Sequence, residues 1–98
     1  MSKSESSFQG SLIKKIKECI PDSIVMKNDA GYIQGIPDLI VLKGNTWAAL
    51  ECKKSGSAKH RPNQDYYISK MNEMSYASFV YPENEKEVLD ELQRTFGV

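Results

Sequence analysis

Apolar side chains recur at helical spacing in the first part of the chain. Between about Glu5 and Ile20, lysines occupy the opposite side of this repeat, and the apolar positions are Phe8, Leu12, Ile16, Cys19 and Ile20. This periodicity predicts an amphipathic helix, which Pro21 ends. A short strand is expected at 23–27, and the polar residues 1–4 are expected to form a flexible tail.

Two short apolar runs in the middle of the chain predict a β-hairpin. Residues 39–42 form the first run, and residues 47–50 form the second. Gly44 and Asn45 lie between them, and turn residues between two apolar runs are typical of a hairpin. We therefore expect an antiparallel pair of strands here, preceded by a turn-rich stretch at 28–31.

The second half of the chain predicts a helix, a strand and a last helix. Pro62 suits the first turn of a helix that reaches to about Met74. Residues 77–81 predict a strand, and Asn84 with Glu87 resembles a capping box at the start of the last helix. The expected order is therefore αβββαβα, which is an α/β fold.

Length and composition place the chain among small globular domains. A chain of 98 residues forms one domain with a modest core and has no room for a separate recognition module. Its two cysteines, Cys19 and Cys52, indicate neither a disulfide scaffold nor a zinc site. The sequence has no signal-peptide-like start and no apolar run of membrane-spanning length, so we expect a cytoplasmic protein.

Charge is balanced overall but unevenly distributed. The chain carries 13 lysines and arginines against 13 acidic residues, whereas nucleic-acid-binding domains tend to be basic. A basic cluster nevertheless follows the second apolar run, and it consists of Lys53, Lys54, Lys59, His60 and Arg61. Acidic residues gather near the end of the chain. This asymmetry predicts one basic and one acidic face, although surface lysines can also serve only solubility.

Charged residues stand at the ends of the two apolar runs, where a core strand normally carries apolar groups. Asp38 opens the first run, and Glu51 and Lys53 close the second. Side chains alternate along a strand, so Glu51 and Lys53 point to one face, about 7 Å apart at the backbone. Asp38 lies on the antiparallel partner and can reach that face. Buried charge is costly unless it is paired or binds a metal, so these residues form a candidate site.

These residues resemble the signature of a nuclease superfamily. Pro37-Asp38 and Glu51-Cys52-Lys53 match the PD-(D/E)XK pattern. The chain is more narrowly similar to a stand-alone virus-type replication-repair nuclease (VRR-NUC) domain, and the residues that carry this similarity are Glu5, Lys27, Gly35-Ile36-Pro37-Asp38 and Gln64. The resemblance implies that residues 1–98 are a single nuclease domain with a restriction-endonuclease-like core, a mixed four-stranded sheet flanked by helices.

The resemblance also implies roles for individual residues. Asp38, Glu51, Lys53 and Gln64 would be catalytic, with Lys53 orienting or helping to deprotonate the attacking water. The ligands of a Mg²⁺ ion, which Mn²⁺ could replace, would be Glu5, Asp38, Glu51 and the backbone carbonyl of Cys52. Two of these assignments have plainer alternatives, because Glu5 could simply favour the helix N-terminus and Gln64 could be an exposed polar residue.

DNA contacts are expected on the basic residues around the signature. The candidates are Lys27, Lys54, Lys59 and Arg61, although Lys27 could instead be a solubility residue at a strand edge. His60, the only histidine, is expected to be a surface group. Tyr32, Tyr66 and Tyr67 could stack on bases, but tyrosines at helical spacing are more typical of a core or an interface.

The function that the resemblance implies is metal-dependent hydrolysis of DNA in a bacterial cell or a phage-infected host. Small stand-alone members of the family resemble Holliday-junction resolvases, which act as homodimers. A flap-cutting, nicking or sequence-specific endonuclease would use the same metal chemistry. A non-catalytic DNA-binding or protein-binding module is the alternative from a different class.

Overall fold

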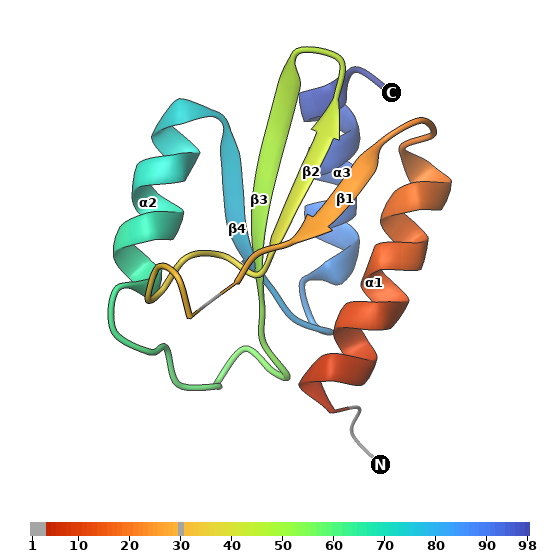
Figure 1. The fold of residues 1–98 in the computed structure, drawn as a ribbon. Coiled ribbons are helices and arrows are strands. Elements are labelled where there is room, and N and C mark those ends of the chain that lie inside the picture. The colour runs from red at the N-terminus through yellow and green to blue at the C-terminus, as the bar shows by residue number, and fades with distance from the viewer. Residues whose placement is uncertain (1–3, 30) are drawn as a thin grey trace.

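The computed structural model describes residues 4–29 and 31–98. In that part of the chain, three helices and four strands follow one another as α1 (Glu5–Cys19), β1 (Ile24–Lys27), β2 (Leu39–Lys43), β3 (Thr46–Cys52), α2 (Gln64–Met74), β4 (Tyr76–Val80) and α3 (Glu85–Phe96) (Figure 1). The expected αβββαβα order is confirmed. Residues 1–3 of the expected tail lie outside the described residues, and Ser4 is the N-cap of α1, with its hydroxyl accepting a hydrogen bond from the Ser7 amide.

The four strands form one mixed sheet in the order β1-β2-β3-β4. The pairs β1–β2 and β2–β3 are antiparallel, whereas β3 and β4 are parallel and are joined through α2. The expected hairpin is β2–β3, in which Lys43 faces Thr46 across a turn of two residues. Gly44 has a φ of 61° at the first turn position, a conformation that favours glycine.

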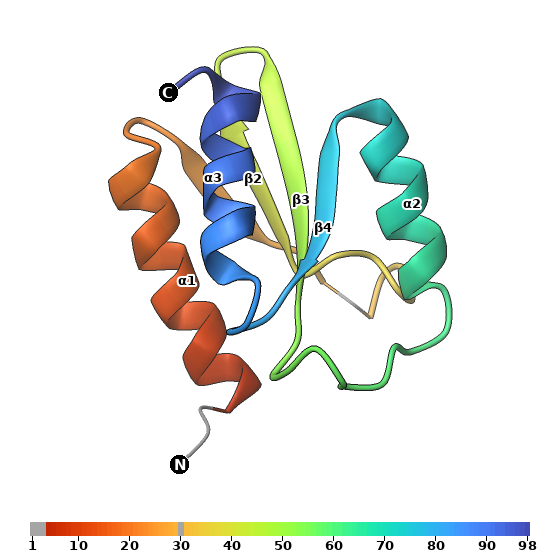
Figure 2. The ribbon, with the colours of Figure 1, turned by 180° about the vertical axis from the view of Figure 1, so that it is seen from behind.

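The apolar core lies between one face of the sheet and two helices. Helices α1 and α3 pack against each other and against β3, and Figure 2 shows them on the same side of the sheet. The largest buried side chains in this layer are Leu12, Ile16, Leu39, Leu50 and Leu92. Burial of each such side chain stabilises the fold by about 1.5–3 kcal/mol. Because side chains alternate along β3, Glu51 and Lys53 point to the opposite face, toward α2.

The start of α2 differs from the expectation. Pro62 does not occupy the first helical turn, because α2 begins at Gln64. Asn63 stands between them in a left-handed conformation, with a φ of 71°, which interrupts the helical path. The strand ends shift by one residue, since β1 begins at Ile24 and β4 spans Tyr76–Val80.

The predicted capping box at α3 is wrong. Asn84 occupies the N-cap position, but its side chain makes no capping hydrogen bond. Its Oδ1 accepts from the Tyr81 amide at 2.8 Å, and its Nδ2 donates to the Phe79 carbonyl at 3.1 Å. Asn84 therefore ties the end of β4 to the turn that follows it.

Among the described residues, no helix has the length and apolar character needed to cross a membrane.

Candidate active site

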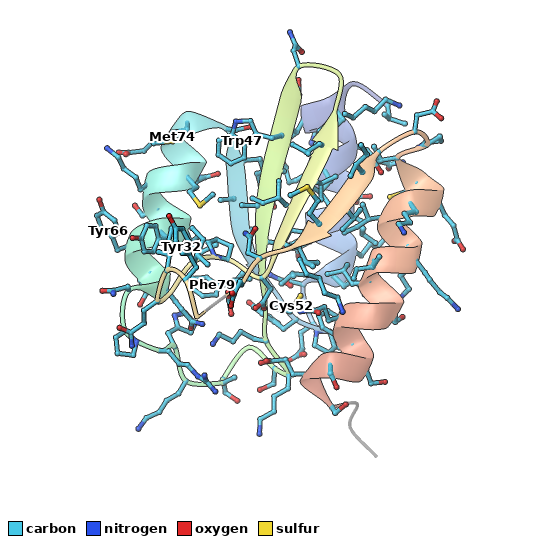
Figure 3. All side chains as sticks on the ribbon, in the orientation of Figure 1. Tyr32, Trp47, Cys52, Tyr66, Met74 and Phe79 are labelled. Carbon is cyan, nitrogen blue, oxygen red and sulfur yellow. The ribbon has the colours of Figure 1, made fainter. Side chains whose placement is uncertain are left out.

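A cavity of about 910 Å³ lies at the end of β3, where the chain leaves the sheet for the loop that leads to α2. Its lining combines the expected carboxylates with basic and amide groups, and it includes Glu5, Asp38, Glu51, Lys53, Lys54, Lys59, Arg61 and Gln64. Figure 3 shows Cys52 and Phe79 together at this end of the sheet. Most of the residues that the sequence suggested therefore meet at one cavity.

Asp38 and Glu51 form the acidic part of the site. Leu39 pairs with Leu50 across the hairpin, which places the preceding Asp38 beside Glu51. The Cys52 amide donates to Asp38 Oδ2 at 2.9 Å and holds that carboxylate in place. Burial raises the pKa of Glu51 to about 8, and the charge of Asp38 adds to this effect, while Lys53 acts in the opposite direction. Glu51 thus occupies a desolvated position beside a second carboxyl group, and both conditions disfavour its negative charge.

Gln64 links the acidic and basic parts of the site. Its Nε2 donates to Glu51 Oε2 at 2.9 Å, and its Oε1 accepts from Lys53 Nζ at 2.6 Å. The Arg61 amide also donates to the same Oε1, at 2.8 Å. Gln64 is only 7% exposed, so the interpretation as an exposed polar residue is wrong.

Lys53 is buried with its amino group fixed at two acceptors. Its side chain is 5% exposed, and Nζ donates to Gln64 Oε1 and, at 3.1 Å, to the Lys59 carbonyl. Lys53 also lines the cavity, where a protonated amino group would have a third N–H to donate. The Lys59 carbonyl and the Gln64 amide oxygen therefore orient Lys53, which forms no direct ion pair with a carboxylate of the described residues.

The loop before β2 needs a glycine to reach the turn before α2. Gly35 has a φ of 89°, and a Cβ placed on it would lie 2.6 Å from Asn63 Cβ and 2.8 Å from the Pro62 carbonyl oxygen. The Asn28 amide and side chain bind the carbonyls of Asp38 and Pro37, at 2.8 and 2.7 Å. These contacts fix the segment that presents Asp38.

The chemistry of this donor set fits a hard divalent cation. Glu51 Oε1 is buried and accepts no hydrogen bond from the described residues. A buried carboxylate oxygen without a partner, beside a second carboxylate, is suited to an ion that prefers oxygen ligands. Burial raises the pKa of the Cys52 thiol to about 12, so the thiol stays protonated and its backbone carbonyl is the oxygen that this residue offers.

Glu5 lies at the edge of this arrangement. It lines the cavity from the first turn of α1, and its charge contributes to the raised pKa of Glu51. Within residues 4–29 and 31–98, however, no three His, Cys, Asp or Glu side chains are gathered closely enough to hold a metal ion. Asp38 and Glu51 are therefore the close pair, and Glu5 is a more distant carboxylate.

Of the four expected DNA-contact residues, the structure brings three to the cavity. Lys54, Lys59 and Arg61 line it, whereas Lys27 does not. Lys27 pairs with Leu39, whose side chain faces the core, so the register directs Lys27 to the face opposite Glu51.

Gln34 and His60 also line the cavity, although the sequence interpretation did not assign them to the site, and His60 is exposed, as expected. The His60 ring stacks on Phe79 with centroids 4.0 Å apart, and its Nδ1 lies 2.7 Å from Asp65 Oδ1. Phe79 belongs to β4, far along the chain, so no local pattern could reveal this contact. The basic cluster around His60 was the only available signal.

Comparisons with known proteins leave the site to be judged on its own geometry. A scan of the sequence against protein-family models finds no match. A search of curated proteins finds no significant match either.

Proposed function

We propose that this chain is a metal-dependent endodeoxyribonuclease of the VRR-NUC type, with a restriction-endonuclease-like core. The observation that carries the proposal is the buried constellation at the end of β3. There Glu51 lies beside Asp38, and Gln64 joins Glu51 to Lys53 through hydrogen bonds of 2.9 and 2.6 Å. The mixed sheet in the order β1-β2-β3-β4 and the αβββαβα succession support the proposed topology.

The metal would be Mg²⁺, with Mn²⁺ able to replace it. Asp38, Glu51 and the Cys52 carbonyl would hold it, and Glu5 would support the site from α1. When bound, the ion supplies charge neutralisation at the phosphate and promotes ionisation of a water molecule. The unpartnered Glu51 Oε1 is the atom of this structure that most favours such a ligand.

The protein groups then divide the remaining tasks. Lys53 offers its third N–H to the attacking water or to the negative charge that develops on the phosphate. Gln64 positions Lys53 and Glu51 relative to one another. Lys54, Lys59 and Arg61 surround the same cavity and would contact the DNA phosphates. Such contacts would recognise the DNA backbone rather than the base sequence.

The most suitable substrate is branched DNA, cut by a homodimer in the manner of a Holliday-junction resolvase. One chain provides one cavity of this kind, and a symmetric pair would provide two sites for the two strands of a junction. Flap-cutting, nicking or sequence-specific cleavage would use the same residues on a different DNA.

Cleavage of labelled DNA tests the proposal. A four-way junction, a flap, a linear duplex and a single strand would be incubated with the protein in Mg²⁺ and in EDTA. We expect metal-dependent cuts, paired and symmetric in the junction, and their loss in Asp38→Ala, Glu51→Ala and Lys53→Ala. Glu73→Ala, which removes an exposed carboxylate of α2, is the matched control.

Two outcomes would contradict the proposal. Cleavage at the wild-type rate in any of the three site variants would remove that residue from the site. Absence of cleavage on every substrate in both Mg²⁺ and Mn²⁺ would favour a non-catalytic DNA-binding module.

A further inference from the structure

A second cavity adjoins the candidate active site and differs from it in character. It measures about 530 Å³, and most of its lining is apolar, from Tyr32, Ile33, Ile36, Ile40 and Met71. Ile36 lines both cavities, so the two are neighbours across the segment that presents Asp38. The size lies within the range of sites that bind small organic groups.

We propose that this second cavity binds an unpaired nucleobase of the DNA next to the phosphate that is cut. This inference rests on the proposed nuclease function and specifies its substrate class, which is DNA with an unstacked base at or near the cleavage position. Flaps and bulges present such bases, whereas a continuous duplex does not.

The lining has the chemistry that a base requires. Tyr32 is 84% exposed, and an exposed aromatic ring beside an apolar hollow provides a surface on which a base can stack. Ile33, Ile40 and Met71 offer apolar contacts to the face or edge of the ring. Figure 3 shows Tyr32 over α2, the helix that contributes Met71.

Polar groups at the same cavity can read the edge of a base. Asn28 and Asp29 line it, and each has one side-chain atom engaged in the loop. Asn28 Nδ2 donates to the Pro37 carbonyl at 2.7 Å, and Asp29 Oδ1 accepts from the Gly31 amide at 2.8 Å. The other polar atoms of these side chains are Asn28 Oδ1 and Asp29 Oδ2, and both oxygens can accept hydrogen bonds from the amino group of a base.

An unpaired base fits better than a paired one for an energetic reason. Bringing a base out of a duplex costs stacking and pairing energy, and this cost is smallest where the base is already unpaired. The adjoining cavity holds the basic residues Lys54, Lys59 and Arg61, which suit the phosphate of the neighbouring nucleotide. One nucleotide can therefore place its phosphate in one cavity and a base in the other.

Binding in EDTA tests the inference without any dependence on cleavage. The probes are two duplexes of equal length, one with a single unpaired 2-aminopurine and one fully paired, and both affinity and 2-aminopurine fluorescence are measured. We expect the wild type to prefer the unpaired probe and to change its fluorescence. Tyr32→Ala should weaken binding of that probe by about tenfold, and Tyr32→Phe should retain it because the stacking surface remains.

Matched controls separate a base site from a general effect. Met71→Ala should also weaken the unpaired probe, whereas Tyr66→Ala should not, because Tyr66 is an exposed tyrosine of α2 that does not line the cavity. Equal affinity of the wild type for both probes would overturn the inference, as would equal losses on both probes in Tyr32→Ala. A Tyr32→Ala protein whose oligomeric state differs from that of the wild type would also overturn the inference, in favour of a second copy that covers the cavity.

The failure of this inference differs from the failure of the proposed function. Metal-dependent cleavage without preference for the unpaired probe would remove the base site and keep the nuclease. Preference for the unpaired probe without cleavage of any DNA in Mg²⁺ or Mn²⁺ would support the base site and remove the nuclease.

Discussion

Glu51 has an unusual environment for a carboxylate side chain. It is 4% exposed, one of its oxygens has no hydrogen-bond partner among the described residues, and its neighbour is another carboxylate. A group in this position destabilises the fold when it is charged. Positions of this kind are typical of functional sites, because stability alone would favour an uncharged side chain.

In metal-free protein, the pH dependence of stability should reveal how much a charged Glu51 destabilises the fold. The folded pKa of Glu51 is about 8, above its usual 4.5. The folded state therefore binds more protons than the unfolded state between these values, and the contribution of Glu51 to stability is lost as the pH rises through about 8. Glu51→Gln, which cannot ionise, should melt higher than the wild type at pH 9, with a smaller difference at pH 5. Thermal melts in EDTA measure this difference.

An exposed carboxylate provides the control for that experiment. Glu73→Gln makes the same change of charge on the outer side of α2 and should give a difference that hardly varies with pH. A constant difference for Glu51→Gln across the same range would contradict the account of Glu51.

Under the proposed function, Gln64 would act through Lys53 and Glu51 rather than by contact with the DNA. Gln64→Ala removes one of the two acceptors of Lys53 and the donor to Glu51 Oε2. We expect cleavage to fall by about tenfold to a hundredfold, as is usual for residues that orient a metal site. Single-turnover rates measure the effect. Gln93→Ala, which removes a hydrogen bond to the Cys19 carbonyl, is the control, and an equal loss in both variants would indicate general destabilisation.

At the scale of elements, the sequence predicted the existence of helices and strands better than the residues at which helices begin. The period of α1 and the turn of the β2–β3 hairpin are local properties, and both elements were predicted correctly. The start of α2 and the cap of α3 depend on tertiary contacts. Pro62 and Asn63 meet Gly35 of a distant loop, and Asn84 binds back to the end of β4. No local pattern contains those partners.

Gly35→Ala tests the contact between the loop before β2 and the turn before α2. Alanine there would have to adopt a φ of 89° and would place its Cβ 2.6 Å from Asn63 Cβ. We expect a loss of about 2 kcal/mol or more in the free energy of unfolding, measured by chemical denaturation, together with reduced cleavage because Asp38 is displaced.

Gly10→Ala is the matched substitution. Gly10 lies within α1, and apart from its chain neighbours and the nearby backbone of the same helix, no atom of the described residues lies within 4 Å of the position of an added Cβ. This variant should gain about 0.5–1 kcal/mol through helix propensity. Unchanged stability in Gly35→Ala would show that the loop accommodates a side chain and does not depend on glycine.

At the scale of the whole molecule, the sequence predicted well which residues belong to the candidate site. It predicted less well how their side chains contact one another. The hairpin register made the meeting of Asp38 with Glu51 and Lys53 predictable. The bridge from Gln64 required knowing how α2 packs over the sheet, and the stacking of His60 required the position of Phe79 on β4. Lys27 could not be assigned because a shift of one residue reverses the face of a strand.

The proposed homodimer predicts a specific mass. The chain weighs 11.1 kDa, so light scattering after gel filtration should give about twice that value. The additional mass should persist on dilution to the concentrations used for junction cleavage. A mass equal to one chain under those conditions would contradict the paired cleavage of a junction by a stable dimer.

Metal binding to the free protein tests the central claim most directly, because it does not require the correct DNA substrate. Mn²⁺ or Mg²⁺ should raise the melting temperature of the wild type at pH 8, since an ion that binds only the folded state stabilises it. Asp38→Ala and Glu51→Gln should lose this increase, whereas Glu73→Gln should keep it. An equal increase in the wild type and both site variants, or no increase in the wild type, would contradict a metal site on Asp38 and Glu51.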